Sequence, residues 1–159
     1  MIPQTKELCL ALHNIRSVYN VGAIFRTADA RGVSKIYLCG YTPAPIDRFG
    51  RARKDIAKAA LGAEKMVSWE SVESLSSLIS KLKKEKYRIL ALEQDEASIN
   101  YKKAKLEKKN LLILGEEVKG IEKEILKTCD EILEIPMKGE KESLNVSVAA
   151  GVALFGLGE

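Results

Sequence analysis

The stretch from residue 131 to residue 155 constrains the fold more than any other part of the sequence. It begins with the apolar residues of a buried strand, continues as a polar loop, and ends in a helix that we expect to start near Ser143. Ser143 and Asn145 carry side chains that satisfy free backbone N–H groups at a helix start. Gly151 lies inside this helix, where glycine costs about 1 kcal/mol relative to alanine. This cost indicates close packing of another element or a ligand at Gly151.

The remaining apolar runs alternate with helical patterns along the chain. Strands are predicted at residues 8–12, 35–39, 87–92 and 111–114, with a short one at 66–69, and helices at 23–31, 55–61, 71–86 and 122–129. Residues 93–110 are polar, and we expect one or two turns of helix there at most. Continuous apolar strands are typical of parallel sheets that are covered on both faces. The order predicts an α/β protein with a doubly wound, Rossmann-like parallel sheet.

Three loops rich in glycine and polar residues follow predicted strands, at residues 14–22, 115–120 and 138–145. The first is read as a turn-rich loop that includes Asn20 and Gly22. Ligands bind at the carboxyl ends of parallel strands, so we expect the three loops to share one site. The chain has no Gly-x-Gly-x-x-Gly after its first strand and no Gly-Lys-Ser/Thr, which argues against nicotinamide enzymes and P-loop nucleotidases.

Charge and residue types narrow the classes of partner. The chain has 26 Lys and Arg against 22 Asp and Glu, a net charge of +4 that permits an anionic partner such as RNA. The densest positive region of the first half surrounds Phe49 and is predicted to contact RNA phosphates through Arg48, Arg51, Arg53 and Lys54; a plain solvated surface is the alternative. With one histidine, His13, and no paired cysteines, neither a catalytic triad nor a metal site is expected.

Length and apolar patterning predict the compartment and the domain organisation. The three cysteines are far apart and sit in apolar runs, as buried thiols of a reducing compartment do. The N-terminal apolar run is too short for a signal peptide, and no run is long enough to span a bilayer. We therefore expect a cytoplasmic protein without membrane contact, whose 159 residues form one domain.

Three segments carry a resemblance to a known family. They are NIRSVYNVGAIFRTADA (14–30), LGEEVKGI (114–121) and IPMKGEKESLNVSVAAG (135–151). In order and spacing they resemble the signature motifs of the SpoU family, also called the TrmH family, of knotted RNA ribose methyltransferases. The resemblance covers essentially the whole chain. It implies the SPOUT fold, in which the C-terminal part, here residues 132–157, is threaded into a deep trefoil knot, an exception to the usual rule against knots.

The resemblance also implies a cofactor, partners and site residues. S-adenosylmethionine would lie in the knot, and the chain would act on tRNA or rRNA as a homodimer whose two knots pack together, with residues 1–159 as a single methyltransferase domain that lacks a separate RNA-binding extension. The implied cofactor-binding residues are Leu92, Gly115, Ile135, Met137 and Leu144, and the implied catalytic residues are Arg26, Asn20, Glu117, Ser143 and Asn145. Arg16 would support structure or RNA.

The implied reaction transfers a methyl group to a ribose 2′-hydroxyl. Arginine is normally too basic to act as a base. Our hypothesis is that Asn20 and an RNA phosphate position Arg26, which orients the hydroxyl and accepts its proton or stabilises the developing alkoxide. From residue chemistry alone, Arg26 is better explained as a surface residue paired with Asp29 or Asp55, and only the resemblance favours the catalytic role. Two other functions stay open: an RNA-binding or assembly protein with little methyl transfer, and a base methyltransferase.

Overall fold

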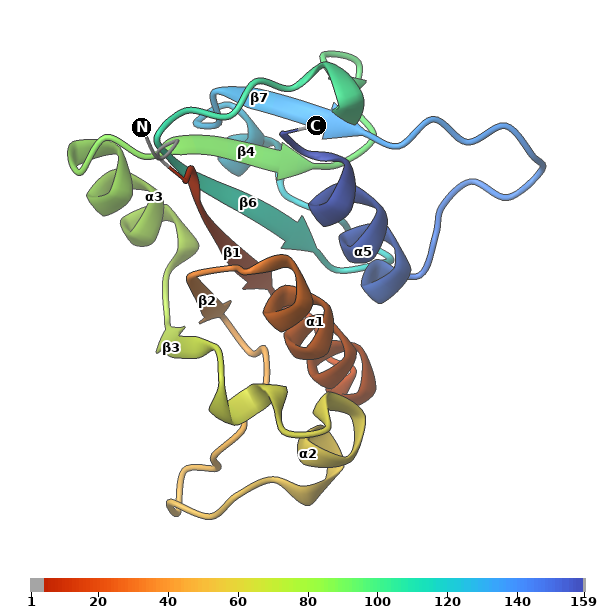
Figure 1. Ribbon diagram of the computed structural model, residues 1–159. Coiled ribbons are helices and arrows are strands. Elements are labelled where there is room, and N and C mark those ends of the chain that lie inside the picture. The colour runs from red at the N-terminus through yellow and green to blue at the C-terminus, as the bar shows by residue number, and fades with distance from the viewer. Residues whose placement is uncertain (1–4, 159) are drawn as a thin grey trace.

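A parallel sheet forms the centre of the molecule in the computed structural model, which describes residues 5–158 (Figure 1). Its strands are β1 (Glu7–His13), β2 (Lys35–Cys39), β3 (Ser68–Val72), β4 (Arg88–Leu92), β5 (Ile99–Asn100), β6 (Lys109–Gly115) and β7 (Glu131–Glu134). They lie in the order β3-β2-β1-β6-β4-β7-β5, and every pairing is parallel. The predicted α/β class with a parallel sheet is confirmed. Residues 1–4, part of the segment considered for a signal peptide, and residue 159 lie outside the described residues.

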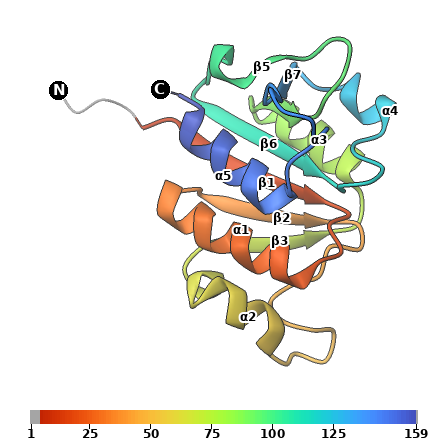
Figure 2. The same ribbon diagram turned by 90° about the vertical axis from the view of Figure 1, so that its right-hand side faces the viewer.

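Helices cover both faces of the sheet (Figure 2). On one face lie α1 (Val18–Arg31), α2 (Lys54–Ala60) and α5 (Val146–Gly156); on the other lie α3 (Leu75–Lys84) and the short α4 (Lys123–Leu126), and the 3₁₀ turns are η1 (Ala63–Lys65) and η2 (Tyr101–Lys103). Strand β1 shows why both faces need cover. Leu10 and Leu12 pack into the core under α1 and α5, and Cys9 and Ala11 pack into the core under α3. Alternate side chains point to opposite faces, so a strand apolar at every position is buried on both.

Helix α1 begins at Val18, five residues before the predicted start at residue 23. Ser17 is its N-cap, and the Ser17 hydroxyl accepts a hydrogen bond from the backbone N–H of Asn20 at 3.1 Å. Asn20 and Gly22 therefore lie inside the helix, and the prediction of a turn-rich loop there was wrong. Gly22 is a packing glycine: a Cβ at this position would lie 2.6 Å from the Cβ of Ala59 and 2.7 Å from the carbonyl of Ile56 in α2.

Helix α5 begins at Val146, and its cap is Asn145, whose Oδ1 accepts the backbone N–H of Ser147 at 2.9 Å. The predicted start near Ser143 was therefore three residues early, because Asn145 supplies the capping oxygen. The C-terminal end of α5 is tied to α1 by Arg31, whose Nε donates to the carbonyl of Leu154 at 2.6 Å.

One expectation about local structure was also wrong, and one about packing is not met by residues 5–158 of this chain. Residues 93–110 hold strand β5 as well as η2, although their polar composition gave no strand signal. The close approach expected at Gly151 is not made within this chain, because a Cβ there would have one near neighbour, Cγ2 of Thr27 at 3.7 Å, an ordinary contact distance.

No helix in residues 5–158 is long and apolar enough to cross a membrane.

Candidate functional site

A cleft of about 260 Å³ opens at the carboxyl ends of β4, β6 and β7. The five residues that the sequence assigned to a cofactor all line it: Leu92, Gly115, Ile135, Met137 and Leu144. They come from three segments that lie side by side because β4 pairs with both β6 and β7. Gly115 is required at its position, since a Cβ there would lie 2.6 Å from Cγ1 of Ile121 and 3.0 Å from the backbone of Gly120.

The carboxylate of Glu117 joins the three sequence motifs beside this cleft. Its Oε1 accepts the Nδ2 amide of Asn20 at 3.0 Å, the Nδ2 amide of Asn145 at 3.4 Å and the backbone N–H of Val146 at 3.4 Å. Asn145 thus caps α5 with its oxygen and contacts Glu117 with its nitrogen. Asn20 is only 6% exposed, so Glu117 also satisfies a buried amide. Three of the five predicted catalytic residues are brought together here.

Arg26 and Ser143 are placed differently. Ser143 is exposed and lines the cleft. Arg26 is exposed on α1, and its side chain makes no hydrogen bond or salt bridge to any of residues 5–158. Arg26 stands six positions after Asn20, about one and two-thirds helical turns, so the two side chains leave α1 in different directions. The expected positioning of Arg26 by Asn20 is not made in this chain. The alternative pairing with Asp55 is not made either, because Asp55 pairs with Arg53.

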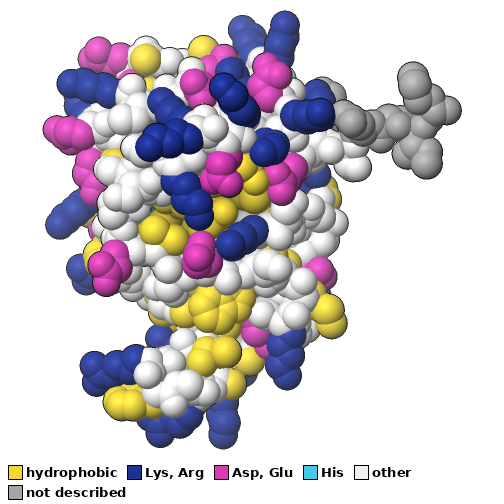
Figure 3. All heavy atoms as spheres, turned by 90° about the vertical axis from the view of Figure 1, so that its left-hand side faces the viewer, with side chains coloured by type: hydrophobic (Ala, Val, Ile, Leu, Met, Phe, Trp, Pro, Cys, Tyr) yellow, Lys and Arg dark blue, Asp and Glu magenta, His cyan; other side chains and the backbone are white. Residues whose placement is uncertain are grey.

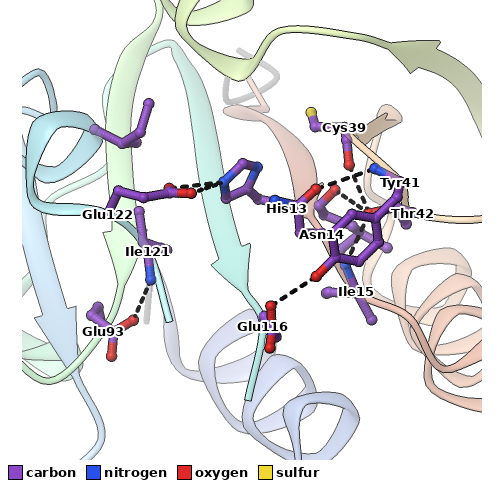
Figure 4. Close-up of polar contacts among 12 residues, drawn as sticks. His13, Asn14, Ile15, Cys39, Tyr41, Thr42, Glu93, Glu116, Ile121 and Glu122 are labelled. Carbon is purple, nitrogen blue, oxygen red and sulfur yellow. Dashed lines mark hydrogen bonds and ion pairs between the residues drawn. The ribbon is translucent and has the colours of Figure 1, made fainter. Parts of the chain in front are cut away.

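Polar contacts fix the loops after β1 and β2 against each other (Figure 4). Asn14 has a left-handed backbone, with a φ of 56°, and its Oδ1 accepts the backbone N–H of Tyr41 at 3.1 Å. Thr42 accepts the N–H of Ile15 at 3.0 Å and lies within hydrogen-bond distance of the carbonyls of Leu12 and Cys39. These bonds hold Tyr41 at the edge of the sheet where the cleft opens.

Tyr41 connects this edge to the cleft. Its hydroxyl donates to Oε2 of Glu116 at 2.8 Å, and Glu116 lines the cleft (Figure 4). The guanidinium of Arg16 lies over the Tyr41 ring at 5.0 Å from its centroid. Hydrogen bonding to Tyr41 and the charges of Tyr41 and Glu116 raise the pKa of Arg16. Arg16, predicted to support structure or RNA, is therefore stacked on an aromatic ring that sequence reasoning missed.

Two further carboxylates shape the loop after β6. Glu93, directly after β4, accepts the backbone N–H of Ile121 at 2.8 Å through Oε2 (Figure 4). Glu122 lies 2.9 Å from Nε2 of His13. Burial opposes ionisation of Glu122, but its own backbone N–H and His13 outweigh it, so the pKa of Glu122 is lowered. His13 thus anchors the start of α4, and its Nδ1 is buried without a partner among residues 5–158.

A sequence profile of the SpoU rRNA methylase family matches residues 7–155. The chain belongs to this family. The resemblance seen in the three motifs is therefore confirmed, and the matched range includes every residue that the sequence assigned to the site.

Individual relatives act on different RNAs. The 23S rRNA (guanosine-2′-O-)-methyltransferase RlmB of Ralstonia nicotianae is 34% identical over 148 residues, which are 93% of this chain and 57% of that protein. The AdoMet-bound rRNA methyltransferase of Sinorhizobium meliloti has a TM-score of 0.86 at 27% identity, over 98% of this chain and 57% of that one. A solved structure from work on the 2-OH methylation of C/U34 on tRNA has a TM-score of 0.79 at 26% identity, over 94% of this chain and 93% of that one. This chain spans little more than half the length of the two rRNA enzymes.

The cleft of this SpoU family chain is acidic. Five carboxylates line it: Glu93, Glu116, Glu117, Glu134 and Glu142. No lysine or arginine among the described residues lines the cleft. Such a cleft favours a cationic ligand and disfavours one that carries phosphate groups. Leu92, Ile135, Met137 and Leu144 add apolar surface for a flat or aliphatic group.

The predicted RNA-contacting residues of this family member lie outside the cleft: Arg16 follows β1, and the other four lie in the loop between β2 and α2 or at the start of α2. Arg48 and Arg51 contact the ring of Phe49, with guanidinium carbons 4.9 and 5.0 Å from its centroid. Arg53 forms an ion pair with Asp55, with 2.9 Å between a guanidinium nitrogen and Oδ2, and Lys54 is exposed at the start of α2.

Three residues at or beside the cleft were not predicted from the sequence, although they share one feature with the predicted ones: each follows a strand. Tyr41, Glu93 and Glu116 each follow a buried strand by one or two positions. Polar residues at these positions gather at one edge of a parallel sheet, which is where ligands bind. Among the described residues, no group of three or more His, Cys, Asp or Glu side chains is arranged to hold a metal ion.

Proposed function

We propose that this chain is an S-adenosylmethionine-dependent ribose 2′-O-methyltransferase that acts on tRNA or rRNA. The observation that carries the proposal is the position of Glu117, which joins Asn20 of the first motif to Asn145 of the third at the rim of a cleft lined by all five expected cofactor residues. Relatives that are named as 2′-O-methyltransferases of rRNA, and a tRNA 2-OH methylation structure of nearly the same length, support it.

The cleft fits the proposed cofactor in its charge and shape. S-adenosylmethionine carries a sulfonium and an ammonium group against one carboxylate, so it suits a cleft with five carboxylates and no cationic side chain among the described residues. The apolar side chains of Leu92, Ile135 and Leu144 would hold its adenine, and Gly115, whose missing Cβ leaves room for Ile121, would contact it through its backbone. When bound, the cofactor supplies the methyl group.

The protein's own part is to bind and orient the ribose hydroxyl. Glu117 fixes Asn20 and Asn145, and Ser143 stands exposed at the cleft, where its hydroxyl can donate to the substrate. Arg26 would lie against the RNA phosphate and the 2′-oxygen, and would stabilise the negative charge that develops there as the proton leaves. An arginine that already carries an internal ion pair would be less free to do this, and Arg26 has no such pair with residues 5–158.

A homodimer would complete this site. Helix α5 exposes Val148, Val152 and Phe155 at 51%, 36% and 52%. Their spacing of four and three places them on one helical face, and an exposed apolar stripe of this kind marks a protein interface. Gly151 lies beside this stripe and has only Cγ2 of Thr27 within 4 Å of where a Cβ would be, so a second chain could approach closely there. Arg26 does not line the cleft of its own chain, so a second copy packed on this side is the means by which we expect an arginine to reach each cleft.

The knot and the compartment belong to the same proposal. Strand β6 follows β4 in sequence yet lies between β1 and β4, and α5 returns to pack on α1, an arrangement compatible with the trefoil knot of the family. We propose that residues 132–157 form the threaded part, that residues 1–159 act as one methyltransferase domain, and that the protein works in the cytoplasm, where its RNA substrates are.

The decisive experiment measures transfer of a labelled methyl group from S-adenosylmethionine to RNA, with 2′-O-methyl mapping of the product. We expect transfer to a ribose, and loss of at least about a hundredfold in rate for Arg26→Ala with cofactor binding unchanged. Cofactor binding without transfer to tRNA, rRNA or total cellular RNA would overturn the proposal in favour of an RNA-binding protein. Methyl groups found on bases would replace it with a base methyltransferase.

Mixing two inactive variants tests the shared site. Arg26→Ala keeps the cleft, and Gly115→Val distorts its wall, because a Cβ at Gly115 would clash with Ile121 and Gly120; thermal melting checks that both variants are folded. If each site takes its arginine from the partner, half of the randomly mixed dimers are mixed and have one intact site, so roughly a quarter of wild-type activity returns. If each chain supplies its own arginine, the mixture stays inactive and the shared site is wrong.

A further inference from the structure

We infer that Phe49 is a stacking platform for an unpaired RNA base, presented by a preformed hairpin of residues 45–53. The inference rests on the proposed function for its ligand class and adds a base-reading contact to a region so far assigned to phosphates. It depends on three observations: the rigidity of the hairpin, the exposure of the Phe49 ring, and the position of the hairpin relative to the cleft.

The hairpin is held by its own backbone and by Asp47. Residues 46 and 52 form an antiparallel bridge, and the N–H of Arg53 donates to the carbonyl of Pro45 at 2.8 Å. Oδ1 of Asp47 accepts the backbone N–H groups of Phe49 at 2.8 Å and Arg51 at 3.0 Å. Asp47 therefore fixes the backbone on both sides of the tip, so that little conformational entropy is lost when a ligand binds there.

The tip exposes an aromatic ring between two cations. Phe49 is 65% exposed, although a phenylalanine side chain gains about 1.5–3 kcal/mol from full burial. The guanidinium groups of Arg48 and Arg51 lie 4.9 and 5.0 Å from its centroid. Unstacked RNA bases are recognised on aromatic rings and on guanidinium planes, and the positive charge suits the adjacent phosphates. A duplex offers no free base face, so the ligand chemistry is a single-stranded segment of RNA.

The hairpin belongs to a loop that also contacts a residue of the cleft. It belongs to the loop after β2, the same loop from which Tyr41 reaches Glu116 at the cleft. Figure 3 shows dark-blue and yellow side chains gathered on the lower projection of the molecule, and Figure 1 places the loop between β2 and α2 at the lower end of the molecule. Because the hairpin lies outside the cleft, we expect Phe49 to hold a base other than that of the target nucleotide.

The test compares RNA with and without bases. The probes are a short single-stranded oligoadenylate, an abasic oligoribonucleotide of the same length, and an RNA duplex, and the measurement is the Kd of each with the full chain at low salt. Phe49→Leu keeps an apolar side chain and removes the ring, and Phe49→Trp keeps a stacking surface. Met66→Ala is the matched control, since Met66 is an exposed apolar residue outside the hairpin, at 74%.

If stacking is correct, Phe49→Leu weakens oligoadenylate binding by roughly five- to 150-fold and leaves the abasic and duplex Kd values within about twofold of wild type. Phe49→Trp restores the wild-type Kd, and Met66→Ala changes none of them. Equal weakening for the oligoadenylate and the abasic probe, or no weakening for either, overturns the inference. Calorimetry with S-adenosylmethionine and thermal melting confirm that each variant is folded.

Failure of the stacking site and failure of the proposed function give different results. If oligoadenylate binding depends on Phe49 but no RNA is methylated, the stacking site is supported and the methyltransferase proposal is overturned. If RNA is methylated but the Kd for oligoadenylate does not depend on Phe49, the methyltransferase proposal is supported and the stacking site is overturned.

Discussion

Replacing Glu117 by alanine removes the one acceptor shared by Asn20, Asn145 and the backbone N–H of Val146. The bond to Asn20, at 3.0 Å, should account for most of the cost, because the other two, at 3.4 Å, are near the limit of hydrogen bonding. An orphaned buried donor costs about 1–3 kcal/mol. Glu117 is itself exposed, so we expect the lower part of this range, about 1–2 kcal/mol of unfolding free energy.

A double-mutant cycle isolates the bond. Urea unfolding of the wild type, Glu117→Ala, Asn20→Ala and the double variant, at one fixed protein concentration, gives the coupling between the two side chains. We expect a coupling free energy of about 0.5–1.5 kcal/mol. The matched control is Glu96→Ala, an exposed carboxylate with no side-chain hydrogen bond among the described residues, which should shift the midpoint little.

Two outcomes would refute this account of Glu117. A coupling free energy below about 0.3 kcal/mol would mean that Glu117 does not hold Asn20, because independent sites add within that margin. Loss of stability without any loss of methyl transfer would mean that the contact joins the motifs but does not position catalytic groups. Both measurements use the same purified variants.

Four further predictions concern packing, pH and salt. Gly22→Ala should lower the Tm by about 2–8 °C, because its Cβ meets the backbone of Ile56, whereas Gly139→Ala, with nothing within 4 Å, should not; calorimetry checks both. The lowered pKa of Glu122 adds stability above its unfolded value, 4.5, that is lost as pH falls through the folded value, so Glu122→Gln should be less stable than wild type at pH 7 and equal to it at low pH in urea titrations. Burial raises the pKa of Cys9 to about 11 and that of Cys39 to about 12, so both thiols should resist iodoacetamide at pH 8 until the protein is unfolded, as mass spectrometry will show. Neutralising Arg48, Arg51 and Arg53 to Gln should flatten the salt dependence of RNA binding by up to about three units of slope, and an unchanged slope would remove these residues from the interface.

The sequence predicted the sheet well because the buried strands are apolar at every position. Strand β2 was predicted with its observed bounds, and β1 and β6 to within two residues at each end. Strand β5 was missed because its two residues depend on pairing with β7, a contact between distant segments that local composition does not encode. The start of α1 was predicted too late because Gly22 was taken as a loop residue. A glycine that breaks a helix and one that packs against a second helix cannot be distinguished from the sequence alone.

The candidate site was predicted in its residues more than in its contacts. The motif resemblance placed five residues around one cleft, and the expected capping role of Asn145 is seen in its bond to Ser147. The partner of Asn20 was not predicted, because Glu117 lies 97 positions away and nothing in either segment marks the pairing. Arg26 was expected beside Asn20, and helical geometry separates them, because six positions along a helix do not return to the same face.

The sorting of charge explains how one small domain could bind a cation and a polyanion together. The net charge of +4 is unevenly distributed: five carboxylates line the cleft, and the hairpin carries Arg48, Arg51 and Arg53. Within a Debye length of about 8 Å, the carboxylates repel a phosphate backbone and attract a cationic cofactor. An RNA strand held at the hairpin would therefore keep most of its phosphates outside the cleft. The phosphate next to a target ribose cannot stay outside, because it is attached to the carbon beside the 2′-hydroxyl, so transfer to the sugar would need a cation such as Arg26 to offset the repulsion between that phosphate and the carboxylates.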